Sequence, residues 1–205
     1  MKRRKWLGMM LGAALSLSAA GSGRAQNASL ADKEKALAYL ETSKKGVLAA
    51  TKGLSEAQWS FKPAPDKWSV AECMEHIATA EDYIRGMIAD NVMKAPGAPD
   101  RDIAKIDAGI MAMVPDRTNK VQAPEPLKPT NRFASPQGSI QHFVDSRGKT
   151  EEFLKSTPDL RGHAADSPVG TKWDAYEFVL LIAAHSERHT KQIEEVKANP
   201  NFPAK

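Results

Sequence analysis

The sequence predicts an all-α protein, a four-helix bundle with a proline-rich insertion between its second and third helices. Four long segments place apolar residues at the spacing of a helix, and strand patterns are weak throughout the chain. Seven prolines fall between residues 95 and 136, which excludes a long regular helix there. Amphipathic helices bury their apolar stripes against one another, so four of them favour a bundle.

The first two helices have clear expected boundaries. The first is expected over residues 29–51, and Gly53 ends it, as glycine commonly does just past a helix. The second is expected over residues 69–93, where Ser69 and Glu72 form the pattern of a capping box. The apolar stripes are Leu37, Leu40, Val47 and Leu48 in the first helix and Ile77, Ala80, Ile84, Met87 and Ile88 in the second.

The insertion at residues 95–136 is the least regular part of the chain. Isoleucines at helical spacing predict a short helix over residues 102–113. Residues 114–135 are expected to form an extended loop that wraps the domain. Two roles stay open for this loop: it could line the mouth of an active site, or it could be a structural strap.

The last two helices complete the bundle. The third is expected over residues 135–156, with Ser135 as N-cap before Pro136. A polar loop over residues 158–172 leads to the fourth helix, expected over residues 173–198. The stripes are Ile140, Phe143, Val144, Arg147, Phe153 and Leu154 in the third helix and Phe178, Leu181, Ile182, His185, His189, Ile193 and Val196 in the fourth.

Residues 1–25 have the features of a secretory signal peptide. Four basic residues precede an uncharged apolar run from Trp6 to Ala20, which is short for a membrane span. The preferred cleavage follows Ala25, and cleavage after Ala20 is the alternative. The mature domain at residues 26–205 is therefore expected to be exported to the periplasm or the outside of the cell, without a stable membrane anchor. Its single cysteine, Cys73, excludes an internal disulfide.

The net charge of the mature chain gives no reason to expect nucleic-acid binding. The full sequence has 29 basic and 25 acidic residues, but residues 1–25 contain five basic side chains and no acidic one. The mature chain is left with 24 basic and 25 acidic side chains. A nucleic-acid-binding domain would need a basic patch. The expected partner is a small-molecule substrate of unknown identity, and a homodimer is left open.

Three histidines on inward helix faces form the candidate metal site. His185 and His189 are one turn apart within the apolar stripe of the fourth helix, so both imidazoles can approach one point. His76 lies on the inward face of the second helix. Three protein ligands from facing helices are typical of catalytic metal sites that keep one coordination position open. His142 and His163 are expected at the surface.

Two neighbours of His76 are candidates for supporting roles. Glu72 lies one turn before His76 and could orient its ring as a hydrogen-bond acceptor, although the capping box also explains Glu72. Cys73 could approach the metal as a thiolate, but a free cysteine is more often a small buried apolar residue. No catalytic residue is identified from the sequence.

The fourth helix lacks the residue that a zinc protease would need. In that class of enzyme a glutamate directly follows the first histidine of the pair. Ser186 occupies this position, and Glu187 points roughly 200° around the helix from His185. The sequence therefore does not support protease chemistry.

These motifs resemble the DinB-like superfamily. The resemblance rests on Leu54-Ser55, Trp59, the run from Pro65 through Trp68-Ser69-Val70 to Glu72 and His76, and the distal His185, His189, Gln192 and Ile193. It spans almost the whole mature chain. It implies a four-helix bundle that holds a divalent metal, often zinc or nickel, and the family's three metal ligands correspond to His76, His185 and His189.

The resemblance implies more than one function. Some relatives are thiol S-transferases that use the metal to activate a low-molecular-weight thiol, and many have no established activity. We therefore expect a metal-dependent hydrolase or S-transferase. A metal-binding protein without turnover, acting in stress response or metal handling, is the alternative. A third possibility is a structural bundle whose histidines are relics.

Overall fold

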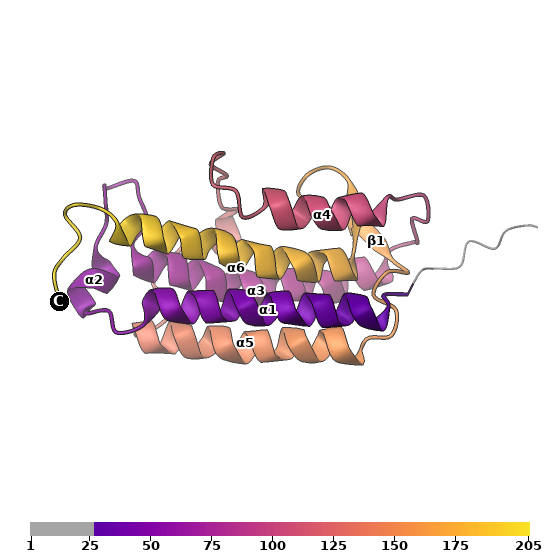
Figure 1. The fold of residues 1–205 in the computed structure, drawn as a ribbon, viewed down its shortest axis with the longest axis horizontal. Coiled ribbons are helices and arrows are strands. Elements are labelled where there is room, and N and C mark those ends of the chain that lie inside the picture. The colour runs from indigo at the N-terminus through magenta and orange to yellow at the C-terminus, as the bar shows by residue number, and fades with distance from the viewer. Residues whose placement is uncertain (1–26) are drawn as a thin grey trace, which may run out of the picture.

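A computed structural model describes residues 27–205, and the expected signal peptide at residues 1–25 lies outside this range. Four long helices lie side by side along the long axis of the domain, as the sequence predicts (Figure 1). In chain order the elements are α1 (Leu30–Thr51), α2 (Glu56–Ser60), α3 (Val70–Asp90), η1 (Val92–Lys94), α4 (Ile103–Met113), η2 (Glu125–Leu127), α5 (Pro136–Ser156), β1 (Ala164–Asp166), β2 (Lys172–Asp174) and α6 (Ala175–Lys197).

Capping residues fix where the long helices begin. At α3 the Ser69 side chain accepts from the backbone of Glu72, whose carboxylate accepts in return from the Ser69 backbone at 2.7 Å. Asp174 and Glu177 form the same reciprocal pair at the start of α6. Each pair satisfies backbone N–H groups that have no partner within the helix. The predicted start of α3 is therefore confirmed.

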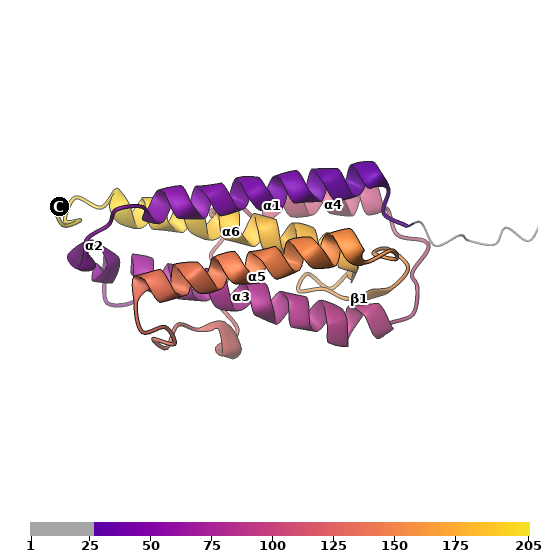
Figure 2. The same ribbon diagram turned by 90° about the horizontal axis from the view of Figure 1, so that it is seen from below.

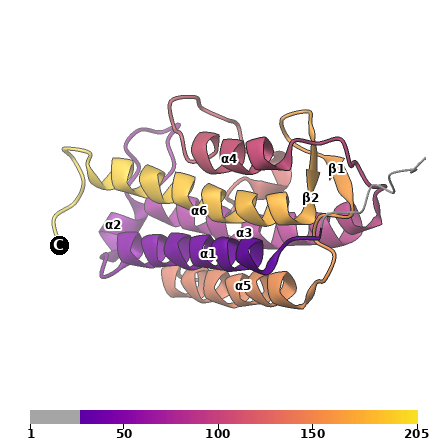
Figure 3. The same cartoon turned by 45° about the vertical axis from the view of Figure 1, so that its right-hand side comes forward.

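The long helices form a four-sided bundle. Helix α1 packs against α5 and α6, and α3 packs against the same two helices, so α1 and α3 are diagonal neighbours. Figures 1 and 2 show the short α2 between them, at the end of the bundle opposite the hairpin of β1 and β2. Helix α4 lies on the outer face of α6 (Figure 3). The faces of α3 and α6 that carry the histidines therefore meet inside the bundle.

The apolar core consists of two clusters along the length of the bundle. One cluster contains Leu40, Ile84 and Phe178, and the other contains Val47, Met74 and Ile193. Each of α1, α3 and α6 contributes to both clusters. Burial of these side chains is the main favourable term for a domain without disulfides.

A buried ion pair lies where the two clusters meet. The Arg147 guanidinium on α5 donates twice to the Glu81 carboxylate on α3, at 2.7 and 2.8 Å. It also donates to the Leu40 carbonyl and Ser43 hydroxyl on α1 and to the Ser186 hydroxyl on α6. All five N–H donors of the guanidinium are used. One buried side chain therefore connects all four long helices.

The structure differs from the sequence-based prediction in four local features. The helix of residues 56–60 is too short to show a periodic pattern. The loop expected over residues 158–172 contains β1, which pairs antiparallel with β2 in strands of three residues each. Trp173, expected in the fourth helix, lies in β2, because Asp174 caps α6 and delays its start to Ala175. Helix α3 also ends at Asp90, before the expected Met93.

A second buried charge network joins the hairpin and α4 to the start of α6. Arg161 pairs with Asp107 at 2.7 Å and with Asp174 at 3.2 Å. Arg101 pairs with Asp174 at 2.8 Å and with Glu177. Three carboxylates share two guanidinium groups here, so the network carries one excess negative charge when every group is ionised. Within residues 27–205, no helix has the length and apolar character needed to cross a membrane.

Replacing Arg147 with methionine is expected to destabilise the fold strongly. The substitution leaves the Glu81 carboxylate buried without its cation, which costs about 3–5 kcal/mol of unfolding free energy. The double variant Arg147→Met/Glu81→Met removes both charges and should recover much of this loss. Urea denaturation of the two variants and the wild type measures both effects. A loss below about 1 kcal/mol in Arg147→Met would show that the pair does not hold the helices together.

The second network predicts a dependence of stability on pH. Burial, with a contribution from Asp174, raises the pKa of Glu177 from 4.5 to about 7. The folded protein therefore holds this proton more tightly than the unfolded chain does, and the resulting stability is full below 4.5 and lost as pH rises through about 7. The unfolding free energy of the wild type minus that of Glu177→Gln should therefore fall as pH rises from about 4.5 to about 7. Chemical denaturation at several pH values measures it, and a constant difference would contradict this assignment.

Candidate metal centre

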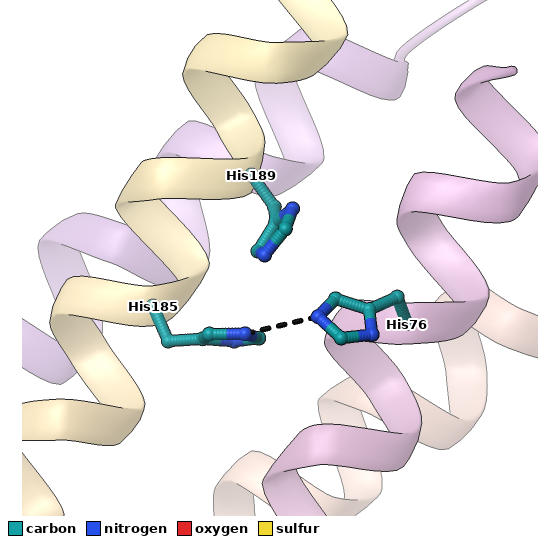
Figure 4. A group of neighbouring side chains, drawn as sticks. All are labelled: His76, His185 and His189. Atoms are coloured by element: carbon teal, nitrogen blue, oxygen red, sulfur yellow. Dashed lines mark hydrogen bonds between the residues drawn. The ribbon is translucent and has the colours of Figure 1, made fainter. Parts of the chain in front are cut away.

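The three histidines of the sequence motif come together between α3 and α6. His76 projects from α3 toward His185 and His189, which lie one turn apart on α6 (Figure 4). The Nε2 atoms of His76 and His185 are 3.0 Å apart, and one ring nitrogen of each histidine lies within 4.8 Å of the others. His76 and His189 are buried, whereas His185 is partly exposed. The three imidazoles thus face one common point at the edge of the core.

The outer nitrogens of two of these rings have hydrogen-bond partners. His76 Nδ1 lies 2.8 Å from the backbone carbonyl of Leu127 in η2. A carbonyl only accepts, so His76 carries its proton on Nδ1 and leaves Nε2 bare. His189 Nδ1 lies 2.8 Å from the side-chain Oε1 of Gln192, one turn further along α6. This contact likewise directs the bare Nε2 of His189 toward the centre of the group.

The surroundings keep the three imidazoles neutral. Burial lowers the pKa of His76 and lowers that of His189 well below its ordinary value. Loss of hydration, together with the proximity of His76 and Arg188, lowers the pKa of His185 to about 3. A neutral imidazole has a lone pair to offer, and a protonated one does not. At neutral pH all three side chains are therefore able to act as ligands.

Trp68 covers one side of the histidine group. Its ring centroid lies 4.8 Å from that of His76 and 6.0 Å from that of His189, and the second pair is stacked. Trp68 is the residue before the N-cap of α3, so the capping box that starts the helix also sets the position of this ring. The indole shields part of the site from water.

The two supporting candidates predicted near His76 have other contacts. Glu72 accepts from the backbone of Ser69 and pairs with Lys62 at 2.9 Å, while the Leu127 carbonyl orients His76. Cys73 is fully buried in the apolar core, and this burial raises the pKa of its thiol. The cluster of metal-binding groups among the described residues contains the three histidines without Cys73. The capping role of Glu72 and the apolar role of Cys73, both considered from the sequence, account for their contacts.

The other candidate groups lie away from the three imidazoles. Glu187 accepts from the Tyr39 hydroxyl at 2.8 Å and pairs with Lys191, which agrees with its predicted direction. His142 pairs with Asp82, and the His163 ring contacts a backbone carbonyl. Both of these histidine side chains are more than a third exposed, so their surface position is as expected.

Sequence reasoning missed the contribution of Leu127. It acts through its backbone carbonyl, so no side-chain pattern marks it. It also missed Glu75, which is buried and accepts from the backbone of Thr130 at 2.7 Å and from the Arg132 side chain at 2.9 Å. Gln192 belongs to the recognised motif, one helical turn after His189, and this spacing could have indicated its contact.

Comparisons with known proteins agree with this fold. The uncharacterized protein YuaE of Bacillus subtilis (strain 168) is 26% identical over 155 residues, which cover 71% of this chain and 87% of YuaE. Among solved structures, YfiT from Bacillus subtilis superposes with a TM-score of 0.56 at 17% identity, over 85% of this chain and 91% of YfiT. YfiT is described as a probable metal-dependent hydrolase with an unusual four-helix bundle topology. At this level of identity the likeness establishes a shared fold.

The family comparison covers most of the chain. The model of the DinB superfamily matches residues 39–193, a range that includes all three clustered histidines. The resemblance inferred from the Trp68-Ser69 helix start and the histidine motif is thereby confirmed. The chain belongs to the DinB superfamily.

Proposed function

We propose that this protein holds one divalent metal ion through the Nε2 atoms of His76, His185 and His189 and uses it to hydrolyse a small-molecule substrate. The convergence of three neutral imidazoles is the observation that carries the proposal. The description of YfiT as a probable metal-dependent hydrolase supports the reaction class. We also propose that the mature chain is exported, because residues 1–25 have the sequence features of a secretory signal peptide.

The donor set fits a divalent metal. Ligand nitrogens around a tetrahedral zinc ion with bonds of roughly 2.0–2.1 Å lie about 3.3 Å apart. The Nε2 atoms of His76 and His185 are 3.0 Å apart, and the third nitrogen is within 4.8 Å. Imidazole ligands suit zinc and nickel, and we propose these two ions. Three protein ligands also leave a coordination position for substrate.

The chain's own residues would hold and shield such a centre. His76 and His189 keep a proton on Nδ1, so their Nε2 lone pairs face inward. Trp68 limits access of water on one side. When bound, the metal would polarise a substrate carbonyl and lower the pKa of a water molecule bound to it toward neutrality. Glu72, Glu75 and Glu187 each have other partners, so none of them is assigned as a general base.

Loss of one histidine should abolish the response of the protein to metal. We expect the wild type to gain thermal stability on addition of zinc or nickel, because a ligand that binds only the folded state adds about 2.7 kcal/mol at 100 times its Kd. His189→Ala removes one ligand and should lose both bound metal and this shift. His142→Ala, a histidine outside the cluster, is the matched control and should keep the shift. A wild type that takes up neither ion and shows no shift would refute the proposed centre.

Hydrolysis should depend on the same centre. A panel of ester and amide substrates, with thiol-conjugation substrates as a separate arm, tests the reaction class. We expect hydrolysis to disappear on chelation, return when metal is restored, and be absent in His76→Ala but present in His142→Ala. Hydrolysis that survives His76→Ala would contradict a metal-centred reaction. Stoichiometric metal without turnover in either arm would favour the non-catalytic metal-binding alternative.

A further inference from the structure

The loop between α4 and α5, residues 114–135, crosses the bundle beside the three histidines, and we call it the strap. It is attached to α3 through Glu75 and to α6 through two arginines. Glu75 and Arg188 are direct sequence neighbours of His76 and His189. The other arginine, Arg117, contacts Gln192, which follows His189 by three residues. The strap contacts therefore concentrate at the proposed metal centre.

The attachment to α3 brings a carbonyl to His76. The buried carboxylate of Glu75 accepts from the backbone N–H groups of Thr130 and Arg132, at 2.7 and 3.3 Å, and from the Arg132 side chain at 2.9 Å. Arg132 in turn donates to two strap carbonyls on either side of Leu127, those of Pro126 and Lys128. This closed set of contacts fixes the turn from which the Leu127 carbonyl reaches His76 Nδ1 at 2.8 Å.

A second attachment acts on His189 through Gln192. Arg117 of the strap makes a two-pronged ion pair with Glu195 of α6, at 2.6 and 2.7 Å. Its Nη1 also donates to Gln192 at 3.2 Å. A guanidinium only donates, so the atom that it contacts is the amide oxygen of Gln192. The same oxygen accepts from His189 Nδ1 at 2.8 Å. Arg117 therefore determines that His189 contacts the oxygen of the Gln192 amide and not its nitrogen.

A third attachment is made by a residue that lies between His185 and His189 in the sequence. Arg188, the residue before His189, donates to the strap carbonyls of Val114 at 3.2 Å, of Asn119 at 2.6 Å, and of Asp116. These bonds hold the first part of the strap against α6. Arg117 is thereby kept in reach of Gln192.

We propose that the strap is the outer frame of the metal centre. Through the Leu127 carbonyl and the Arg117–Gln192 contact it fixes the Nδ1–H form of two of the three ligands. Gln192 and Glu75 are then positioning residues, and metal affinity and strap order depend on each other. The proposal rests on metal binding by the three histidines. Partners of this kind orient metal-bound histidines and raise their basicity, and their loss typically lowers metal affinity about 10- to 100-fold.

The test compares two substitutions of Gln192. Gln192→Met has a similar size but cannot accept from His189, so the Kd for zinc should rise about 10- to 100-fold. Gln192→Glu still accepts, and should bind zinc at least as tightly as the wild type. Glu194→Gln is the matched control, because Glu194 on the same helix pairs with Lys197 and contacts neither the strap nor a histidine. Zinc affinity is measured by competition with a chromophoric chelator, and the cobalt-substituted protein reports ligand geometry by its visible absorption.

The reverse coupling is tested by limited trypsin digestion after the exposed Lys120 of the strap. Zinc should slow this cut several-fold in the wild type and in Glu194→Gln, but not in Gln192→Met. Glu75→Gln, which weakens the attachment to α3, should show the same loss and covers the case of a Gln192 variant that does not fold. Wild-type affinity in Gln192→Met and Glu75→Gln would overturn the frame while leaving the metal centre intact. Failure of the wild type to bind either zinc or nickel would instead refute the metal centre itself.

Discussion

The buried Arg147–Glu81 ion pair is the interaction on which the geometry of this bundle depends. Apolar stripes favour the packing of two helices, but they only weakly determine the position of one helix along the axis of the other. Arg147 removes this freedom, because its guanidinium uses all five donors on groups of α1, α3 and α6. On α3 the contact is Glu81, five residues after His76, and on α6 it is Ser186, next to His185. The same pair that connects the helices therefore aligns the two faces that carry the imidazoles.

This alignment creates a polar group that the fold must satisfy. Three imidazoles at the edge of an apolar core would each cost free energy if their nitrogens had no partners. The strap and Gln192 accept from the Nδ1 atoms of His76 and His189, and what remains is a set of inward Nε2 atoms. The two Nε2 atoms at 3.0 Å can share one proton, or their lone pairs can share a cation. Burial, together with nearby ionisable groups, lowers the pKa of all three rings. Protonation of the rings is therefore disfavoured, and their lone pairs stay available to a metal ion.

The sequence was sufficient to predict the four long helices and the residues of the histidine group, for a physical reason. Helical periodicity and capping boxes depend on residues close together in the sequence. A His-x3-His pair within an apolar stripe likewise shows that both side chains point into the core. Glu75 and Leu127 were out of reach, because their roles arise from contacts more than 50 residues apart in the chain. The β1–β2 hairpin was missed since three-residue strands are too short to show alternation. Arg147 was placed on the inward stripe of its helix, but nothing local indicated that a charge there would find five acceptors.

One proline of the strap, Pro129, helps to leave free the carbonyl that contacts His76. A carbonyl inside a long helix is already used by the N–H four residues later. The short helix η2 ends at Leu127, so the Leu127 carbonyl is one of the orphan acceptors of a helix end. Pro129, two residues later, has no N–H and cannot continue a helix. The chain therefore leaves η2 in an extended conformation, with Lys128 at φ −65° and ψ 136°, and the free carbonyl is available to the imidazole. An irregular segment suits this position because a regular helix would have used the same oxygen itself.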